Sequence, residues 1–363
     1  MNPSSLRSQL SSRSASRWLV ALFALLSPLS SQAAHLEFVT EVNGTISDVT
    51  AQRILYSATE DGLLRLKVIG RTTGTIRTIP DIPQETPFNE QLTSRGAIFG
   101  TTADDGSFIY EWTGTTPQGR GGTPRGLHVS PVSKQYAVWP VWTVGPFGQG
   151  RYVSFRDVMA FTTTLVGNSY LTGEPDVSDA GEIAFTQGPG PANVFRYRSG
   201  QTTQLTNATT YSHFDPLTDG INVVYRKQIS STHSEIVMRN DNVGEAVLRA
   251  SSAEFLAPRV DYQPSGGWIA FTRVDAVQGA SVRQVWLRSP QGGIFPVSVF
   301  GTDSYINAVG NGQVMFVNGG YLYLGRIGMA PTLIAPFAEG TQSMWLQGSW
   351  HVYFGGALYR VVI

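Results

Sequence analysis

The chain has 363 residues, of which 14% are charged, and its 26 Lys and Arg residues balance its 26 Asp and Glu residues. A neutral chain lacks the basic surface with which nucleic-acid-binding proteins neutralise phosphates, so nucleic acid is not expected as a partner. The absence of cysteine excludes disulfides, thiolate metal ligands and cysteine nucleophiles. Abundant glycine and proline, 39 and 20 residues, favour many short strands joined by turns.

Residues 1–34 have the features of a cleavable signal peptide. Three arginines and no acidic residue precede the apolar run 18–26, and small residues at 31–34 fit a signal-peptidase site. The apolar run is short for a membrane span, so we expect no stable membrane insertion after cleavage, an uncleaved anchor being the alternative. The chain therefore divides into a signal peptide, 1–34, and a single domain, 35–363, destined for the periplasm or the outside of a bacterial cell.

A short apolar strand that ends in an aromatic residue recurs through the remaining sequence. Successive copies lie 38 to 46 residues apart, which is the length of a four-stranded propeller blade. The pattern predicts an all-β fold, a closed β-propeller of about eight four-stranded blades, with seven as the alternative. We expect the aromatic residues to pack between neighbouring blades. They are Tyr56, Phe99, Trp139, Phe185, Tyr225, Phe271, Phe316 and Phe354.

The two ends of this region indicate how the ring closes. The last repeat, 343–363, has material for only about three strands, and the segment 35–42 is a strand without a blade of its own. Pairing the N-terminal strand with the C-terminal strands would complete the eighth blade and remove both free sheet edges.

One repeat carries a recognisable signature. Residues 174–185, Glu-Pro-Asp-Val-Ser-Asp-Ala-Gly-Glu-Ile-Ala-Phe, resemble the blade signature of TolB-like, WD40-like propellers, and 257–271 and 214–225 are weaker versions. The resemblance implies a propeller fold and an exported setting. TolB itself carries an α/β domain before its propeller, whereas here the blades follow the predicted signal peptide almost directly, so the function of TolB is not implied.

Candidate binding residues lie in the segments between the second and third strands of repeats three to six. These segments, 142–151, 187–192, 227–234 and 273–280, are longer than their counterparts in repeats seven and eight, and binding residues concentrate on such loops. Aromatic side chains stack on sugars or apolar groups, and arginines bind carboxylates. The alternative is that these are ordinary surface loops. The predicted contact residues are Trp142, Phe147, Arg151, Arg226, His233 and Arg273.

No catalytic, metal or cofactor site is predicted. The five histidines, His35, His128, His213, His233 and His351, lie in different repeats without metal-binding spacing, and no Gly-x-Ser-x-Gly motif is present. Segment 119–126, which contains Arg120 and Arg125, is interpreted as a solvated linker. These features favour a monomeric, non-enzymatic binding or scaffold protein that recognises a protein or glycan partner.

The alternative function is a polysaccharide lyase or glycoside hydrolase with its site at the mouth of the propeller channel. Such enzymes use histidine, arginine or carboxylate groups drawn from several blades. Convergence of at least two of five residues around one pocket would favour the enzyme: His128, His213, His233, Arg273 and Asp275.

Overall fold

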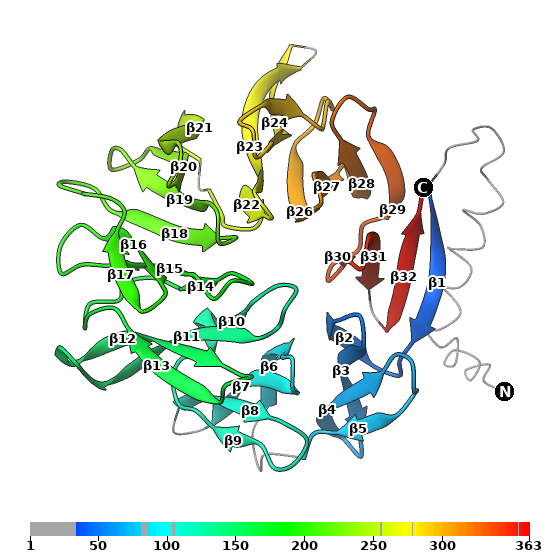
Figure 1. Ribbon diagram of the computed structural model, residues 1–363. Coiled ribbons are helices and arrows are strands. Elements are labelled where there is room, and N and C mark those ends of the chain that lie inside the picture. Colours follow the sequence, from blue (N-terminus) through cyan, green and yellow to red (C-terminus); the bar gives the residue numbers. More distant parts are fainter. Residues whose placement is uncertain (1–33, 81–85, 104–105, 255, 278, 355) are drawn as a thin grey trace, which may run out of the picture.

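The computed structural model describes residues 34–80, 86–103, 106–254, 256–277, 279–354 and 356–363. The predicted signal peptide lies outside the described residues, apart from residue 34. Strands in the described part form eight antiparallel sheets of four strands each, arranged as blades around a ring (Figure 1). The prediction of an all-β propeller with eight blades is confirmed.

The first four blades follow one another along the chain. Blade one is β2 (Thr45–Val49), β3 (Arg53–Glu60), β4 (Leu63–Gly70) and β5 (Ile76–Thr78), and blade two is β6 (Thr86–Leu92), β7 (Ala97–Ala103), β8 (Gly106–Trp112) and β9 (Gln118–Gly119). A short 3-10 helix, η1 (Pro124–Gly126), precedes blade three, which is β10 (His128–Val129), β11 (Tyr136–Gly145), β12 (Gly148–Asp157) and β13 (Thr162–Val166). Blade four is β14 (Asp176–Val177), β15 (Ile183–Gln187), β16 (Asn193–Arg198) and β17 (Gln201–Gln204).

The remaining blades repeat this order, and only the last one borrows a strand. Blade five is β18 (His213–Thr218), β19 (Val223–Gln228), β20 (Ser234–Asn240) and β21 (Gly244–Ser252), and blade six is β22 (Tyr262–Ser265), β23 (Trp268–Val277), β24 (Ala280–Arg288) and β25 (Ile294–Pro296). Blade seven is β26 (Ser304–Gly310), β27 (Gln313–Asn318), β28 (Tyr321–Arg326) and β29 (Thr332–Pro336). Blade eight combines β30 (Gln342–Leu346), β31 (Ser349–Phe354) and β32 (Ala357–Val362) with β1 (His35–Glu41).

Closure of the ring is the pairing of β1 with β32. The two strands are antiparallel from His35 opposite Val362 to Glu41 opposite Ala357. The ring of Phe38 packs edge-on against that of Tyr359, with 5.9 Å between ring centres. The first strand of the fold therefore becomes the outer strand of the last blade, as the sequence predicts.

The core lies between the blades. The apolar triplet on each second strand is buried because neighbouring sheets pack face to face, so that one hydrophobic cluster joins Val138 and Val153 of blade three to Ile183 and Phe185 of blade four. Seven of the eight recurring aromatic residues are buried, as expected. Phe354 is half-buried at the end of β31, where it packs against the cluster between blades seven and eight and stacks on Tyr359 of β32.

The two faces of the ring follow from strand direction. The first strand of each blade lies innermost and the antiparallel neighbours alternate in direction (Figure 1). The start of every first strand therefore lies on the same face as the turn between the second and third strands. We call this the upper face. The turn between the first and second strands lies on the opposite, lower face.

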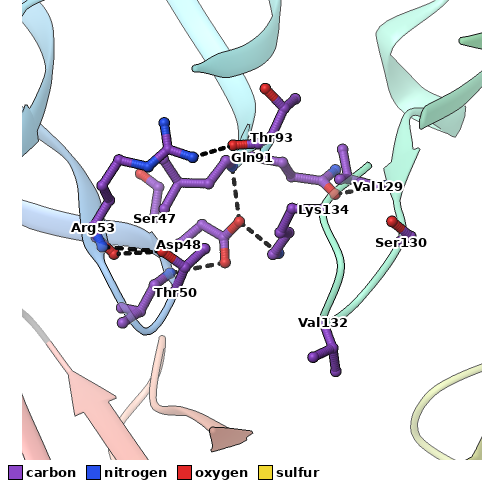
Figure 2. A network of polar contacts seen from close by, with 12 residues as sticks. Ser47, Asp48, Thr50, Arg53, Gln91, Thr93, Val129, Ser130, Val132 and Lys134 are labelled. Atoms are coloured by element: carbon purple, nitrogen blue, oxygen red, sulfur yellow. Dashed lines mark hydrogen bonds and ion pairs between the residues drawn. The ribbon is translucent and has the colours of Figure 1, made fainter. Parts of the chain in front are cut away.

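A buried ion pair ties together the first three blades near the axis (Figure 2). Asp48 of β2 accepts hydrogen bonds from the backbone N–H of Val49, from that of Leu92 in blade two and from Lys134 Nζ in blade three, each at 2.8 Å. Both charged side chains are buried. Lys134 reaches blade one across blade two, which is feasible only because the blades converge at their inner strands.

Replacing Lys134 with methionine should therefore destabilise the ring. The substitution leaves the Asp48 carboxylate buried without its cation, which costs about 3 kcal/mol of unfolding free energy. Chemical denaturation followed by tryptophan fluorescence measures this value. The control is Lys227→Met, which removes a partly exposed ion pair with Glu245 and should cost about 1 kcal/mol or less. Equal losses in the two variants would contradict the assignment.

Candidate binding site on blades three to six

Two of the four predicted loops are in fact extended strands. β11 continues to Gly145 and β12 begins at Gly148, so a two-residue turn closes a long hairpin, and β23 and β24 run likewise to Val277 and from Ala280. Glycine-rich sequence indicated loops, but the alternation of side chains along 142–151 is that of paired strands. The segments of repeats four and five are loops as predicted, at 188–192 and 229–233.

The tip of the β11–β12 hairpin is held rigidly from below. The ring of Tyr152 is buried beneath the tip; its hydroxyl donates to the carbonyl of Gly148 at 2.7 Å and accepts the N–H of Phe147 at 3.2 Å. A Cβ at Gly145 would lie 2.5 Å from this ring, so only glycine fits there. The hairpin therefore presents its outer side chains in a defined arrangement.

Those outer side chains are large and apolar. Trp142, Val144 and Phe147 are 68%, 74% and 69% exposed. Trp142 lies opposite Arg151 of β12, which forms a bridge to Tyr170 on its other side, so an arginine separates two exposed aromatic residues in adjacent strands. We call Trp142, Val144, Phe147 and Tyr170 the hairpin patch. Together with the adjacent Arg151, the hairpin patch contains three of the six predicted contact residues.

The other three predicted contact residues lie elsewhere on the arc. Arg226 of β19 is turned inward, where its Nη2 lies 3.2 Å from Asp215 Oδ2 and its guanidinium covers the ring of Phe214 at 4.6 Å. Burial raises the pKa of Asp215, and Arg226 opposes this shift. His233 lies in the exposed loop between β19 and β20, where its backbone N–H donates to Ser230.

Arg273 lies on β23, at a cleft between blades five and six. Its Nε donates to Asp275 Oδ1 at 2.9 Å, and its guanidinium covers the ring of Trp286 at 4.0 Å. The six predicted residues thus occupy four places rather than one site. Arg273 and Asp275 are two of the five residues named as indicators of an enzyme. They lie on the same strand, however, so their contact does not show that residues from different blades meet at one pocket.

A second polar system surrounds the axis of the ring. Asp176 occupies in blade four the position that Asp48 has in blade one, since both face the middle residue of the second-strand triplet. Asp176 likewise accepts a backbone N–H from the next blade, that of Thr218, and a cation from the blade after, Arg259 Nη2 at 2.6 Å. Arg259 has a positive φ of 64° and remains partly exposed.

Further charged groups from two blades adjoin Arg259. Its Nη2 lies 3.3 Å from His128 Nδ1 on β10, and His128 Nε2 lies 3.8 Å from the Glu174 carboxylate just before β14. Arg125 of η1, almost fully exposed, lies 3.8 Å from the other oxygen of Glu174. We call Arg125, His128, Glu174, Asp176 and Arg259 the inner-rim cluster. Blades three, four and six and the helix before blade three all contribute to it.

The inner-rim cluster favours a negative charge on Glu174. The imidazole of His128 is the main cause that lowers the pKa of this carboxyl; partial burial opposes the shift, and Arg125 and Arg151 add to it. A carboxylate that stays ionised is suited to binding cations or hydroxyl groups and is a weak proton acceptor. Arg151 also connects the cluster electrostatically to the hairpin patch.

Sequence reasoning missed four of the five residues of this cluster as a site. Glu174 and Asp176 belong to the blade signature, Arg125 lies in the segment interpreted as a linker, and only His128 is among the residues named as indicators of an enzyme. Arg259 lies more than 80 residues from Asp176. The sequence feature that could have identified this cluster was the register of the repeats, because it places the starts of all first strands at the axis of the ring.

The remaining histidines take no part in these groupings. His213 and His351 are buried, and burial lowers the pKa of each. Within the described residues no group of three or more His, Asp or Glu side chains is arranged to hold a metal ion. No helix among those residues is long and apolar enough to cross a membrane.

Comparison with solved structures finds chains of similar fold. The chain is similar to the computationally designed Ika8 protein, with 14% identity, a TM-score of 0.54 and coverage of 90% of this chain and 99% of that one. It is also similar to TolB from Acinetobacter baumannii, with 15% identity and a TM-score of 0.39 over 67% of this chain, and it spans 62% of the TolB chain. Neither a protein-family model nor a curated protein sequence matches it. At these identities the likeness shows the fold alone.

The pKa of Glu174 offers a test of the inner-rim geometry. Replacing His128 with alanine should raise this pKa toward the ordinary value, because the main cause of the lowering is removed. A depressed folded-state pKa stabilises the protein above the unfolded-state pKa, and this contribution disappears as the pH falls through the folded-state value. The variant should therefore lose less stability in acid.

A 13C NMR titration of the Glu174 carboxyl measures the shift directly. His233→Ala, in the exposed loop of blade five, serves as the control and should leave the titration unchanged. A Glu174 titration curve that is the same in the wild type and in His128→Ala would show that the imidazole does not act on this carboxyl.

Proposed function

We propose that this chain is an exported propeller that binds a protein or glycan partner through the upper face of blades three to six. The signal-peptide features of residues 1–34 support export, and the closed ring supports a rigid binding scaffold. The monomer suffices for this role, because the ring closes within one chain.

The observation that carries the proposal is the hairpin patch. Trp142 and Phe147 expose most of their surface, whereas Trp139 and Tyr152 of the same blade are buried. Exposed aromatic side chains on a rigid support are the common anchors of binding interfaces, since they contribute contact area at little cost in conformational entropy. Arg151, between Trp142 and Tyr170, adds a hydrogen-bond donor to the apolar surface.

The double substitution Trp142→Ser with Phe147→Ser should abolish partner capture without affecting the fold. Loss of a tryptophan anchor costs about 2 kcal/mol or more, about a thirtyfold rise in Kd, whereas exposed side chains contribute little to stability. Quantitative mass spectrometry compares the proteins crosslinked to the wild type and to the variant in the exported fraction of the native host.

The matched control is Val132→Ser. Val132 is 66% exposed in the same blade, but it lies in the turn between β10 and β11, on the lower face. This variant should capture the same partners as the wild type. Equal recovery by the hairpin variant, or no partner with the wild type, would contradict the proposed surface.

The inner-rim cluster supports a second candidate, a polysaccharide lyase or glycoside hydrolase. It joins a histidine, two carboxylates and two arginines from separate blades, as such enzymes do. The lowered pKa of Glu174 argues for binding over proton transfer.

The two candidates differ in a direct assay. Incubation with a panel of uronic-acid polysaccharides and neutral glycans, monitored by ultraviolet absorbance and reducing ends, should show product only if the chain is an enzyme. In that case His128→Gln should abolish turnover while the hairpin variant retains it. Lack of product across the panel would count against the enzyme.

A further inference from the structure

A cleft beside Arg273 is separate from the hairpin patch. One wall is the end of β21 and the residues after it, and the other is the extended part of β23. Its volume is about 800 Å³, within the range of small-molecule binding sites.

The wall from blade five is built around a buried arginine. Arg249 is only 2% exposed, and it donates to Thr272 Oγ1 at 3.0 Å and to Glu254 Oε2 at 2.7 Å. Arg283 of β24 donates to the same oxygen at 2.7 Å. Two guanidiniums therefore fix one oxygen of Glu254, and the other oxygen, Oε1, accepts no hydrogen bond from the described residues.

The wall from blade six is equally fixed. Asp275 uses both oxygens internally, since Oδ1 accepts Arg273 Nε at 2.9 Å and Oδ2 accepts Trp286 Nε1 at 2.6 Å. Arg273 is held by this bond and by its stacking on the indole ring. Its two Nη groups make no hydrogen bond to any residue that the structure describes, and its side chain is 43% exposed.

The charges that line the cleft are already balanced. Arg249 and Arg273 are each paired with a carboxylate of the lining, Glu254 or Asp275. A ligand with a net charge would leave one charge without a partner or would break a pair, both of which are costly in a partly desolvated cleft. A hydroxyl group both donates and accepts, so it can bind Glu254 Oε1 and Arg273 Nη without disturbing either pair.

The rest of the lining suits the carbon skeleton of a sugar. Ala250, Ala253 and Val274 supply small apolar surface beside the polar groups. We propose that the cleft between blades five and six binds a neutral saccharide of one or two units through Glu254 and Arg273. This site is independent of the hairpin patch, and it extends the binding role of the same upper face.

The test uses defined sugars. Methyl glycosides of glucose, galactose, mannose and N-acetylglucosamine are titrated into the full-length mature protein and followed by saturation-transfer NMR and calorimetry, with glucuronic acid as the charged comparison. At least one neutral glycoside should bind, and it should bind more tightly than glucuronic acid. Ala253→Trp, which places an indole in the cleft, should abolish this binding.

Two further variants keep the result interpretable. Arg273→Met removes the Nη donors and should weaken binding about tenfold or more, which carries the test if the tryptophan variant fails to fold. Ala330→Trp, at an exposed position in the turn between β28 and β29 of blade seven, is the steric control and should bind as the wild type does.

The hairpin double variant separates this proposal from the proposed function. It should bind the glycoside normally even where partner capture is lost. The saccharide site is overturned by three results: no neutral glycoside binds the wild type, binding persists in both cleft variants, or glucuronic acid binds more tightly than every neutral glycoside.

Discussion

The pairing of β1 with β32 is the constraint on which the rest of the structure depends. Each blade buries its flat sides only against neighbouring blades, so a row of eight would leave two apolar sheet faces and two open edges in water. Joining the first strand to the last blade removes the ends of the row at once. The chain has no disulfide to substitute for this pairing, so closure relies on backbone hydrogen bonds, packing and the ion pair between Glu37 of β1 and Arg360 of β32.

Closure also explains why the ion pair of Asp48 and the pair of Asp176 have the same form. Once the blades are fixed in a ring, each of these two inner-strand aspartates faces the backbone of the next blade and lies within reach of a long cationic side chain from the blade after that. In blades one to three the cation is a buried lysine. In blades four to six the cation is a partly exposed arginine. The pair of Asp176 and Arg259 therefore contributes to the surface of the inner-rim cluster.

The fold was predictable from the sequence because the same sequence pattern recurs in each blade. Eight copies of one apolar triplet at a regular spacing define the blade, and the isolated strand at 35–42 defines the closure. The site was less predictable because its groups come from several repeats that lie far apart in the sequence. Glu174, His128 and Arg259 meet only through the curvature of the ring, and a linear sequence contains no measure of which blades face one another across the axis.

The hairpin of blade three shows a different limit. Its glycines were interpreted as loop residues, yet Gly145 is required because the ring of Tyr152 occupies the space of a Cβ, and that ring keeps the strands paired to the tip. The residues predicted there as contacts, Trp142 and Phe147, are exposed, although they lie on a strand hairpin and its two-residue turn instead of on a long loop. The rigid support from Tyr152 changes what the exposure of these two side chains implies. On a mobile loop an aromatic residue can fold back against the protein, whereas a strand that is pinned from below keeps its side chains in water until another molecule covers them.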